Sequence, residues 1–231
     1  MRRVEAATAI VAAVLLLPAT VVAAPAPQAH VTRWAYLLRP APARASPTLR
    51  ARVVTVVGPA TPEGESNLVR ILEERKDGRL QEWVRVDLAT RPNGTTGWVP
   101  RDALGDIRAV RTRLVIDRTS RTATLFHAGQ AVFRAAVGIG TARYPTPAGT
   151  FTVRERLARI DDPFYGPIAF GTTARSPVLT DWPGGGFVGI HGTDRPDLIP
   201  GRVSHGCVRL RNADIRRLAV LMPVGTPVTI R

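Results

Sequence analysis

The residues with the clearest capacity for chemistry are one cysteine and the histidines near it. Cys207 is the only cysteine of the 231-residue chain, and it lies in residues 204–209, with the sequence SHGCVR. A second histidine, His191, precedes this segment and is followed by Gly192. A thiol attacks as its thiolate, whose free pKa of about 8.5 is usually lowered by a neighbouring imidazole. These residue types predict nucleophilic catalysis by Cys207.

Two histidines are candidates for the base that takes the thiol proton. His205 lies two positions before Cys207, so in an extended segment both side chains would point to the same face. His191 follows the apolar run 188–190, which predicts a strand, and would approach from an adjacent strand. The second arrangement suits a base better. A backbone carbonyl beside His191 could then fix its tautomer, as a carboxylate does in the serine triad.

Small and polar residues around this pair predict supporting roles. Gly192 and Gly206 let backbone segments come close together, and amide N–H groups around Gly206 and Cys207 could form an oxyanion hole. Ser204 is predicted as a hydrogen-bonding support, and Arg209 as a group that orients a substrate carboxylate with two hydrogen bonds. Aromatic residues in loops are further candidates to line the cleft: Tyr144, Phe164, Tyr165 and Trp182.

The N-terminus has the order of a secretory signal peptide. The basic residues Arg2 and Arg3 precede an apolar run over residues 6–17, and small residues follow. This pattern predicts a signal peptide over residues 1–24 and a short linker over 25–30. The alternative is that the apolar run stays as an N-terminal membrane anchor. Either one predicts an exported protein in the periplasm or extracytoplasmic cell wall, where a lone cysteine cannot form an internal disulfide.

Charge and composition limit the possible partners. The chain has 32 basic and 18 acidic side chains, a net charge of +14. Such a balance raises the question of nucleic acid, but export separates the protein from it, and Lys76 is the only lysine among the basic residues. We therefore predict no nucleic-acid partner, and attraction to an anionic cell envelope. The single-copy domains predict a monomer, and the hydrophobic content of 45% is that of a globular chain.

Residues 31–104 predict a small β-barrel. Strand-forming runs at 52–57 and 83–86 alternate with turn sequences, among them Asn93, whose Asn-Gly pair fits a hairpin turn better than a glycosylation site. Residues 97–100, with the sequence GWVP, and the WVRV run at 83–86 resemble the bacterial SH3-like domains often attached to wall-active enzymes. The tryptophans of these two runs are predicted to be buried.

Residues 111–231 predict a second unit that is mainly β with one short helix. Apolar runs between residues 114 and 137 predict strands, two of them joined by a turn that begins at His127. Only residues 212–221 have helical spacing, with Asn212 as the predicted N-cap. The predicted buried face of this helix consists of Ile215, Leu218, Ala219 and Met222.

The cysteine motif resembles the signature of the L,D-transpeptidase catalytic domain, also called the YkuD domain. His191 and Gly192 followed by residues 204–209 match this signature. Residues 144–151, with the sequence YPTPAGTF, are similar to the Pro-Thr-Pro-x-Gly-x-Phe segment of the family, and residues 225–230 are similar to its final strand. The resemblance covers nearly all of residues 111–231 and shows no departure at the catalytic positions.

The resemblance implies a β-sandwich-like domain with Cys207 as nucleophile and His191 as proton acceptor and donor, supported by His205, Gly206 and Arg209. It implies that the substrate is a peptidoglycan stem tetrapeptide, opened between its third residue and the terminal D-alanine. Cys207 would form a thioester and release D-alanine. The side-chain amine of another stem would then resolve the thioester into a 3→3 crosslink during cell wall biogenesis. No metal or organic cofactor is expected.

Other interpretations of the same residues stay open at this point. The thioester could end in hydrolysis, as in an L,D-carboxypeptidase, or in D-amino-acid exchange, because loop shape selects the nucleophile that resolves it. A chain in which the SH3-like domain dominates would instead be a wall-binding module without catalysis. A zinc site of His191, His205 and Cys207, or a buried inert cysteine, fits less well with the glycine-tight spacing.

Overall fold

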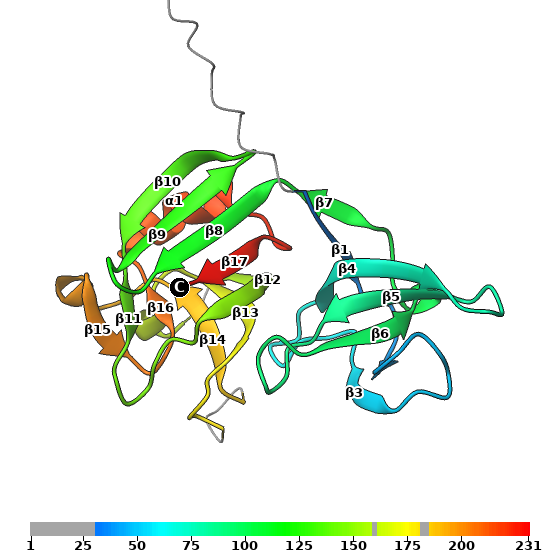
Figure 1. Ribbon diagram of the computed structural model, residues 1–231. Coiled ribbons are helices and arrows are strands. Elements are labelled where there is room, and N and C mark those ends of the chain that lie inside the picture. Colours follow the sequence, from blue (N-terminus) through cyan, green and yellow to red (C-terminus); the bar gives the residue numbers. More distant parts are fainter. Residues whose placement is uncertain (1–30, 159–160, 181–184) are drawn as a thin grey trace, which may run out of the picture.

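The structure is a computed structural model that describes residues 31–158, 161–180 and 185–231. Two β-rich units lie side by side and are joined through the segment between strands β7 and β8 (Figure 1). The predicted signal peptide and linker lie outside the described residues, as does Trp182. No helix in the described ranges is long and apolar enough to cross a membrane.

The N-terminal unit is a seven-stranded antiparallel sheet with the strand order β3-β2-β6-β5-β4-β1-β7. The bounds of its elements are β1 Thr32–Tyr36, β2 Ala41–Arg44, β3 Val53–Val57, β4 Leu68–Lys76, β5 Glu82–Asp87, β6 Thr96–Pro100, the 3-10 helix η1 Arg101–Ala103 and β7 Arg108–Val110. Strand β7 pairs with β1, so the sheet continues past residue 104, where the sequence predicted the end of this domain. An SH3-like identity for this unit remains a prediction.

Local expectations for the N-terminal unit agree with the structure. Trp83 and Trp98 are buried, as their size predicts. The turn at Asn93 is confirmed, with Gly94 in the left-handed region at a φ of 83° and the Thr95 N–H donating to the Pro92 carbonyl over 3.3 Å. The core beneath the sheet consists mainly of alanine, valine and leucine side chains.

The C-terminal unit is a ten-stranded sheet with the strand order β10-β9-β8-β17-β12-β13-β14-β16-β11-β15. Its strands are β8 Thr112–Asp117, β9 Thr122–His127, β10 Gln130–Ala136, β11 Gly138–Gly140, β12 Gly149–Ala158, β13 Ile168–Arg175, β14 Phe187–His191, β15 Gly201–Ser204, β16 Val208–Arg209 and β17 Pro227–Ile230. Its helices are α1 Asn212–Leu221 and the 3-10 helices η2 Pro163–Tyr165 and η3 Pro196–Leu198. The mainly β prediction with one short α-helix is confirmed for the described residues.

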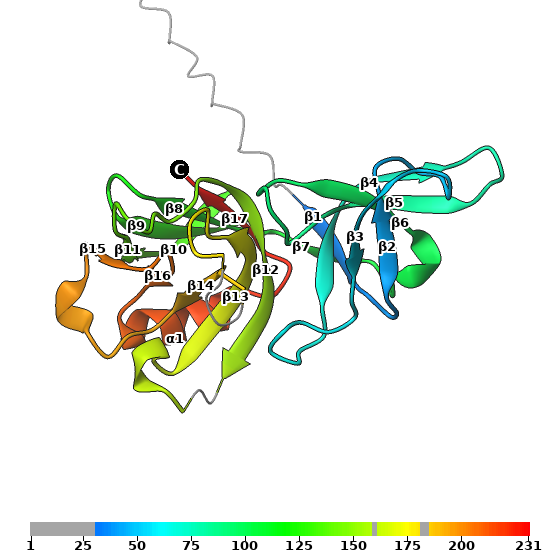
Figure 2. The ribbon, with the colours of Figure 1, turned by 90° about the horizontal axis from the view of Figure 1, so that it is seen from below.

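Strand β12 makes the ten-stranded sheet curl. Its first residues, 149–152, pair with β17, and its later residues, 153–158, pair with β13. Figures 1 and 2 show the result: β8 and β9 lie in one layer, β13 and β14 lie in another, and β12 passes between the layers. The arrangement is sandwich-like although one sheet forms both layers. Three neighbouring pairs are parallel, β8–β17, β14–β16 and β11–β15.

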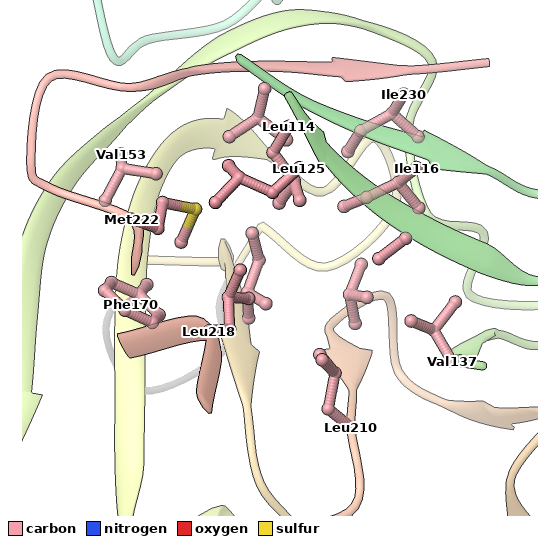
Figure 3. Close-up of a cluster of buried hydrophobic side chains, with 14 of the residues drawn as sticks. Leu114, Ile116, Leu125, Val137, Val153, Phe170, Leu210, Leu218, Met222 and Ile230 are labelled. Carbon is pink, nitrogen blue, oxygen red and sulfur yellow. The ribbon is translucent and has the colours of Figure 1, made fainter. Parts of the chain in front are cut away.

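The core between these layers is closed by helix α1. Its Ile215, Leu218 and Ala219 are buried, and so is Met222 just after it, as the helical spacing predicted. Figure 3 shows Leu218 and Met222 among side chains that come from β8, β9, β13 and β17. The prediction of Asn212 as N-cap is wrong, because Arg211 takes that position and provides no side-chain cap. The Asn212 side chain instead bonds to the turn that follows β14.

Candidate active site

Parallel pairing of β14 and β16 brings the cysteine and a histidine to neighbouring strands. His191 is the last residue of β14 and is aligned with Arg209 of β16, while Ile190 is aligned with Val208. Cys207 directly precedes β16 and accepts a hydrogen bond at Sγ from the Gly189 N–H, over 3.3 Å. The thiol and the imidazole line one cleft. The strand-to-strand approach of His191 agrees with the sequence prediction.

The tautomer of His191 is defined by a backbone carbonyl. The side chain is 1% exposed, and its Nδ1 lies 2.7 Å from the carbonyl oxygen of Gly192. A carbonyl oxygen can only accept, so Nδ1 carries the proton and the lone pair is on Nε2. This Nε2 is buried and has no hydrogen-bond partner among the described residues. The carbonyl that the sequence predicted beside His191 is therefore that of Gly192.

Gly192 is needed because another side chain crosses the same space. A Cβ at Gly192 would lie 2.4 Å from Oδ1 of Asn212 and 3.0 Å from the Cα of Gly166. The same Asn212 oxygen accepts a hydrogen bond from the Thr193 N–H over 2.9 Å. Asn212 thus fixes the turn that presents the Gly192 carbonyl to the imidazole of His191.

The surroundings of the pair favour its neutral form. Burial lowers the pKa of His191 to about 4, with a smaller contribution in the same direction from the positive charge of Arg209. Burial also raises the pKa of the Cys207 thiol, although the Gly189 N–H and Arg209 act against this. The sequence predicted a thiol made acidic by its histidine. Burial therefore acts against the acidic thiol that the sequence predicted and favours a neutral imidazole.

Ser204 and Thr146 shape the turn that carries Cys207. Ser204 Oγ donates to the Cys207 carbonyl over 2.6 Å and accepts from the Gly206 N–H over 3.0 Å. Thr146 Oγ1 donates to the Gly206 carbonyl over 2.7 Å and accepts from the Gly140 N–H over 2.8 Å. Gly206 has a φ of 121°, which an L side chain rarely adopts. Ser204 is therefore a hydrogen-bonding support, and the Gly206 N–H is already committed rather than open to an oxyanion.

The aromatic residues of η2 cover the imidazole. The rings of Phe164 and Tyr165 have their centroids 5.9 and 5.1 Å from that of His191. The buried guanidinium of Arg209 lies 4.2 Å from the Phe164 ring centroid, and its Nε has no hydrogen-bond partner among the described residues. Burial, followed by the nearby Cys207, raises the pKa of Tyr165. The eleven residues lining the cleft are Phe164, Tyr165, Ser176, Leu179, Gly186, Phe187, His191, Ser204, His205, Cys207 and Arg209.

The remaining predicted site residues lie at the edge of the cleft or outside the described chain. His205 lines the cleft but is exposed, and its ring centroid is 4.8 Å from that of Tyr144. Tyr144 contacts the site through this ring. Trp182 belongs to residues 181–184, outside the described ranges. Within those ranges, no three His, Cys, Asp or Glu side chains gather as a metal site would require.

Sequence reasoning did not single out several residues of this cleft. Ser176 and Leu179 come from the connection between β13 and β14, Phe187 is the first residue of β14, and no motif marks them. Thr146 lies in the segment that supported the family resemblance, but its two backbone contacts depend on the fold. The sequence signal for Thr146 was its position between two prolines. Its burial is seen only in the structure.

A thiol and an imidazole that line one cleft are the residue types that cysteine-dependent acyltransferases use. Residues 111–230 match the family model of the YkuD L,D-transpeptidase catalytic domain. The chain therefore belongs to the L,D-transpeptidase family.

Known proteins with similar sequences carry the same family name. A Bacillus licheniformis protein named as a YkuD L,D-transpeptidase is 30% identical over 118 residues, which are 51% of this chain and 64% of that protein. A Salmonella typhimurium protein named as the L,D-transpeptidase ErfK/SrfK is 35% identical over 164 residues, 63% of this chain and 52% of that protein. The chain thus spans less than two thirds of the length of these relatives.

Solved structures in the same family are also similar. The catalytic domain of Enterococcus faecium L,D-transpeptidase has 25% identity and a TM-score of 0.41, covering 52% of this chain and 96% of that one. An L,D-transpeptidase from Mycobacterium smegmatis has 18% identity and a TM-score of 0.43, covering 71% of this chain and 90% of that one.

Proposed function

We propose that this chain is an exported peptidoglycan L,D-transpeptidase. Cys207 attacks the carbonyl of the L-centre in the third residue of a stem tetrapeptide and releases the terminal D-alanine. The observation that carries the proposal is the cleft shared by Cys207 and His191, in which the unpartnered Nε2 is buried. Membership of the L,D-transpeptidase family supports the assignment of the substrate.

The first half of the reaction forms a thioester. As sulfur bonds to the carbonyl carbon, His191 Nε2 accepts the thiol proton and the carbonyl π electrons move to oxygen. The tetrahedral intermediate collapses, the C–N bond breaks, and the proton on Nε2 passes to the leaving amine of D-alanine. Burial raises the pKa of the thiol and lowers that of the imidazole, so in this proposal the proton moves together with the attack rather than before it.

The second half transfers the acyl group to an acceptor amine. The side-chain amine of another stem attacks the thioester carbonyl and gives a proton to Nε2. The C–S bond then breaks, and the proton passes from Nε2 to sulfur, which restores the Cys207 thiol. The product is a 3→3 crosslink. The Gly206 N–H is bonded to Ser204, so we assign the oxyanion to the Cys207 N–H, a contact typically worth about 3 kcal/mol. Gly206 and His205 then orient the turn.

Arg209 is the proposed anchor for the substrate carboxylate. Among the described residues it has no carboxylate partner within salt-bridge distance, although it is only 6% exposed. A buried guanidinium is costly unless it is paired. The carboxylate of the terminal D-alanine would supply that charge. Ser204 and Tyr144 would support the substrate at the same end of the cleft.

A basic groove supports an anionic cell envelope as partner. It is lined from β8, β9, β10 and α1, and it contains Arg113, Arg134, Arg217 and Arg231. Asp117 lies 3.3 Å from Arg231 and offsets part of this charge. Such a groove favours long-range attraction to a polyanion at low salt. We place the protein in the periplasm or extracytoplasmic wall, as a monomer, without a nucleic-acid partner.

Two other functions use the same fold. Water or a free D-amino acid could resolve the thioester, which would make the protein an L,D-carboxypeptidase or an exchange enzyme. A wall-binding module without catalysis is the second alternative. The presence of the thiol and the imidazole in one cleft favours catalysis over this module.

The test is a product assay with disaccharide-tetrapeptide fragments, followed by mass spectrometry. The protein from residue 24 onward is compared with Cys207→Ala. A cysteine-dependent dimer that lacks one D-alanine is the expected result. Loss of D-alanine without a dimer would replace the proposal with carboxypeptidase activity. No cysteine-dependent change would overturn the catalytic assignment and favour the binding module.

A further inference from the structure

The loop between β5 and β6 of the N-terminal unit reaches the C-terminal unit beside the cleft. Arg91 of this loop donates from Nε to the Ser176 carbonyl over 2.9 Å. Its Nη2 donates to the carbonyls of Leu179 and Gly185, over 2.9 and 3.2 Å. One guanidinium therefore holds three backbone carbonyls of the other unit. Figure 1 shows the N-terminal unit on the side of the C-terminal unit where β12 and β13 lie.

These three carbonyls belong to the connection between β13 and β14, which forms one wall of the cleft. Ser176 and Leu179 line the cleft with Cys207 and His191. The connection is closed on itself by the Ser176 N–H, which donates to the Gly186 carbonyl over 2.8 Å. Arg91 thus contacts both the outgoing and the returning chain of the wall, without touching the thiol or the imidazole.

A second set of contacts fixes the start of the same wall. The Asn93 side chain donates to the Arg175 carbonyl over 2.8 Å and accepts from the Arg175 N–H over 2.9 Å. Arg175 Nε donates in return to the Ala89 carbonyl over 3.0 Å. Its guanidinium lies 3.6 Å from the ring centroid of Phe187, another residue of the cleft. The N-terminal unit therefore reaches an aromatic side chain of the cleft through one intermediate residue.

We propose that Arg91 is a positioning residue for peptide binding, through which the N-terminal unit sets the shape of the cleft wall formed by residues 175–180 and 185–187. The proposal rests on the proposed function for the identity of the substrate. Arg91 acts through Ser176 and Leu179 and does not touch the reacting atoms. Its effect falls on the binding of an extended stem peptide rather than on the reactivity of the thiol.

The geometry explains why arginine stands at this position. Three carbonyls are reached from two nitrogens, Nε and Nη2, of one planar group, which matches the rigid geometry of a guanidinium. A lysine ammonium is a point charge on a flexible stem and cannot reproduce this spacing. Arg91→Lys therefore tests whether the planar guanidinium geometry is required, and Arg91→Ala tests whether the contact as a whole is required.

The matched control is Arg44→Ala. Arg44 is also a partly buried arginine of the N-terminal unit that donates to a backbone carbonyl, that of Ala51 over 2.8 Å, but this contact stays within its own unit. Asn93→Ala is a further variant that removes the neighbouring contacts while keeping Arg91. Melting temperatures of all variants report any general loss of stability.

The experiment combines peptide kinetics with amide hydrogen exchange of the full chain. For Arg91→Ala we expect the KM for the tetrapeptide to rise about tenfold with little change in kcat, because several hydrogen bonds to a charged group are lost. Exchange should become faster in residues 175–180 and 185–187, while the alkylation rate of Cys207 by iodoacetamide stays unchanged. Arg91→Lys should give a smaller rise in KM, and Arg44→Ala none.

The outcomes separate this inference from the proposed function. Unchanged KM and unchanged exchange in Arg91→Ala would overturn the positioning role. A uniform increase of exchange in both units would also overturn it, because Arg91 would then be a general structural residue. Local acceleration of exchange without any turnover of tetrapeptide by the native chain would overturn the proposed function and support the positioning of the wall.

Discussion

The two β-rich units of the chain differ in their cores and in what each contributes to the cleft. The core of the C-terminal unit combines phenylalanine, leucine and isoleucine side chains with helix α1, whereas the N-terminal core is mainly alanine, valine and leucine. Cys207 and His191 both belong to the C-terminal unit. The N-terminal unit adds polar contacts from its β5–β6 loop. The comparison teaches that the proposed reacting groups come from one unit, while both units support the walls of the cleft.

The largest effect is expected at the imidazole of the C-terminal unit. His191→Gln removes the proton acceptor, and kcat/KM should fall by at least about a thousandfold. Burial lowers the His191 pKa to about 4, so the neutral base of the native protein persists as the pH falls. Its kcat/KM should therefore stay level from neutral pH to about pH 5 and decline near pH 4.

Steady-state kinetics across this pH range check both statements. His127→Gln is the matched control, because His127 lies at the end of β9 and is exposed. A decline centred near pH 6.5 would show that the imidazole is not desolvated in the cleft.

The core of the C-terminal unit should give the next largest effect. Leu218→Ala opens a cavity between α1 and the sheet and should lower the free energy of unfolding by about 2–5 kcal/mol. Val220 of the same helix is 85% exposed, so Val220→Ala should change stability by less than about 0.5 kcal/mol. Denaturant unfolding monitored by circular dichroism checks the pair. Equal losses would mean that α1 does not pack as described.

Ser204→Ala should have a smaller effect on the chemistry. The substitution leaves the Gly206 N–H and the Cys207 carbonyl without their present partner, and we expect kcat to fall about tenfold. Ser120→Ala, at an exposed turn, is the control. Single-turnover kinetics with the tetrapeptide provide the measurement. A variant with native kcat would show that the turn holds its shape without this hydroxyl.

The smallest effect is expected at the contact between the two units that involves the Glu63 carboxyl group. Arg154 of the C-terminal unit bonds to Glu63 over 3.2 Å and to Glu155 over 2.7 Å. Burial, followed by the Glu155 carboxylate, raises the pKa of Glu63. A raised carboxyl pKa means that the folded protein binds this proton more tightly than the unfolded chain. The associated stability is present at acid pH and is lost as the pH rises through the folded value.

Glu63→Gln should remove this dependence. The variant should melt about 1–2 °C above the native protein at neutral pH and show no gain below about pH 4. Glu74→Gln is the control, because Glu74 pairs with Arg33 at the exposed surface of the N-terminal unit. Thermal melts over a pH series would contradict the prediction if the two variants behaved alike.

Local patterns in the sequence predicted much of the C-terminal unit. Alternating strands around the turn at His127, the buried face of α1 and the carbonyl that fixes His191 all depend on residues close together in the chain. Asn212 illustrates the limit. A residue type that caps helices also suits a turn, and only the fold shows that its partner is the Thr193 N–H.

Contacts between distant segments could not be predicted in this way. The thiol was expected to be acidic because of an imidazole approaching from an adjacent strand, but burial has the larger influence on its pKa. Nothing in the residues around Arg91 indicates that its guanidinium bonds to a wall more than 80 positions later in the chain. The burial of Cys207 depends on the fold of the C-terminal unit, and the contacts of Arg91 depend on how the two units dock.

The burial of the Cys207 thiol also bears on how readily it is oxidised. Peroxides and disulfides react with the thiolate, so a thiol whose pKa is raised by burial is oxidised slowly. A sulfenic acid formed there would find no second cysteine in this chain to condense with. Slow oxidation would therefore protect the lone thiol of this chain. Burial in the cleft favours it by raising the thiol pKa.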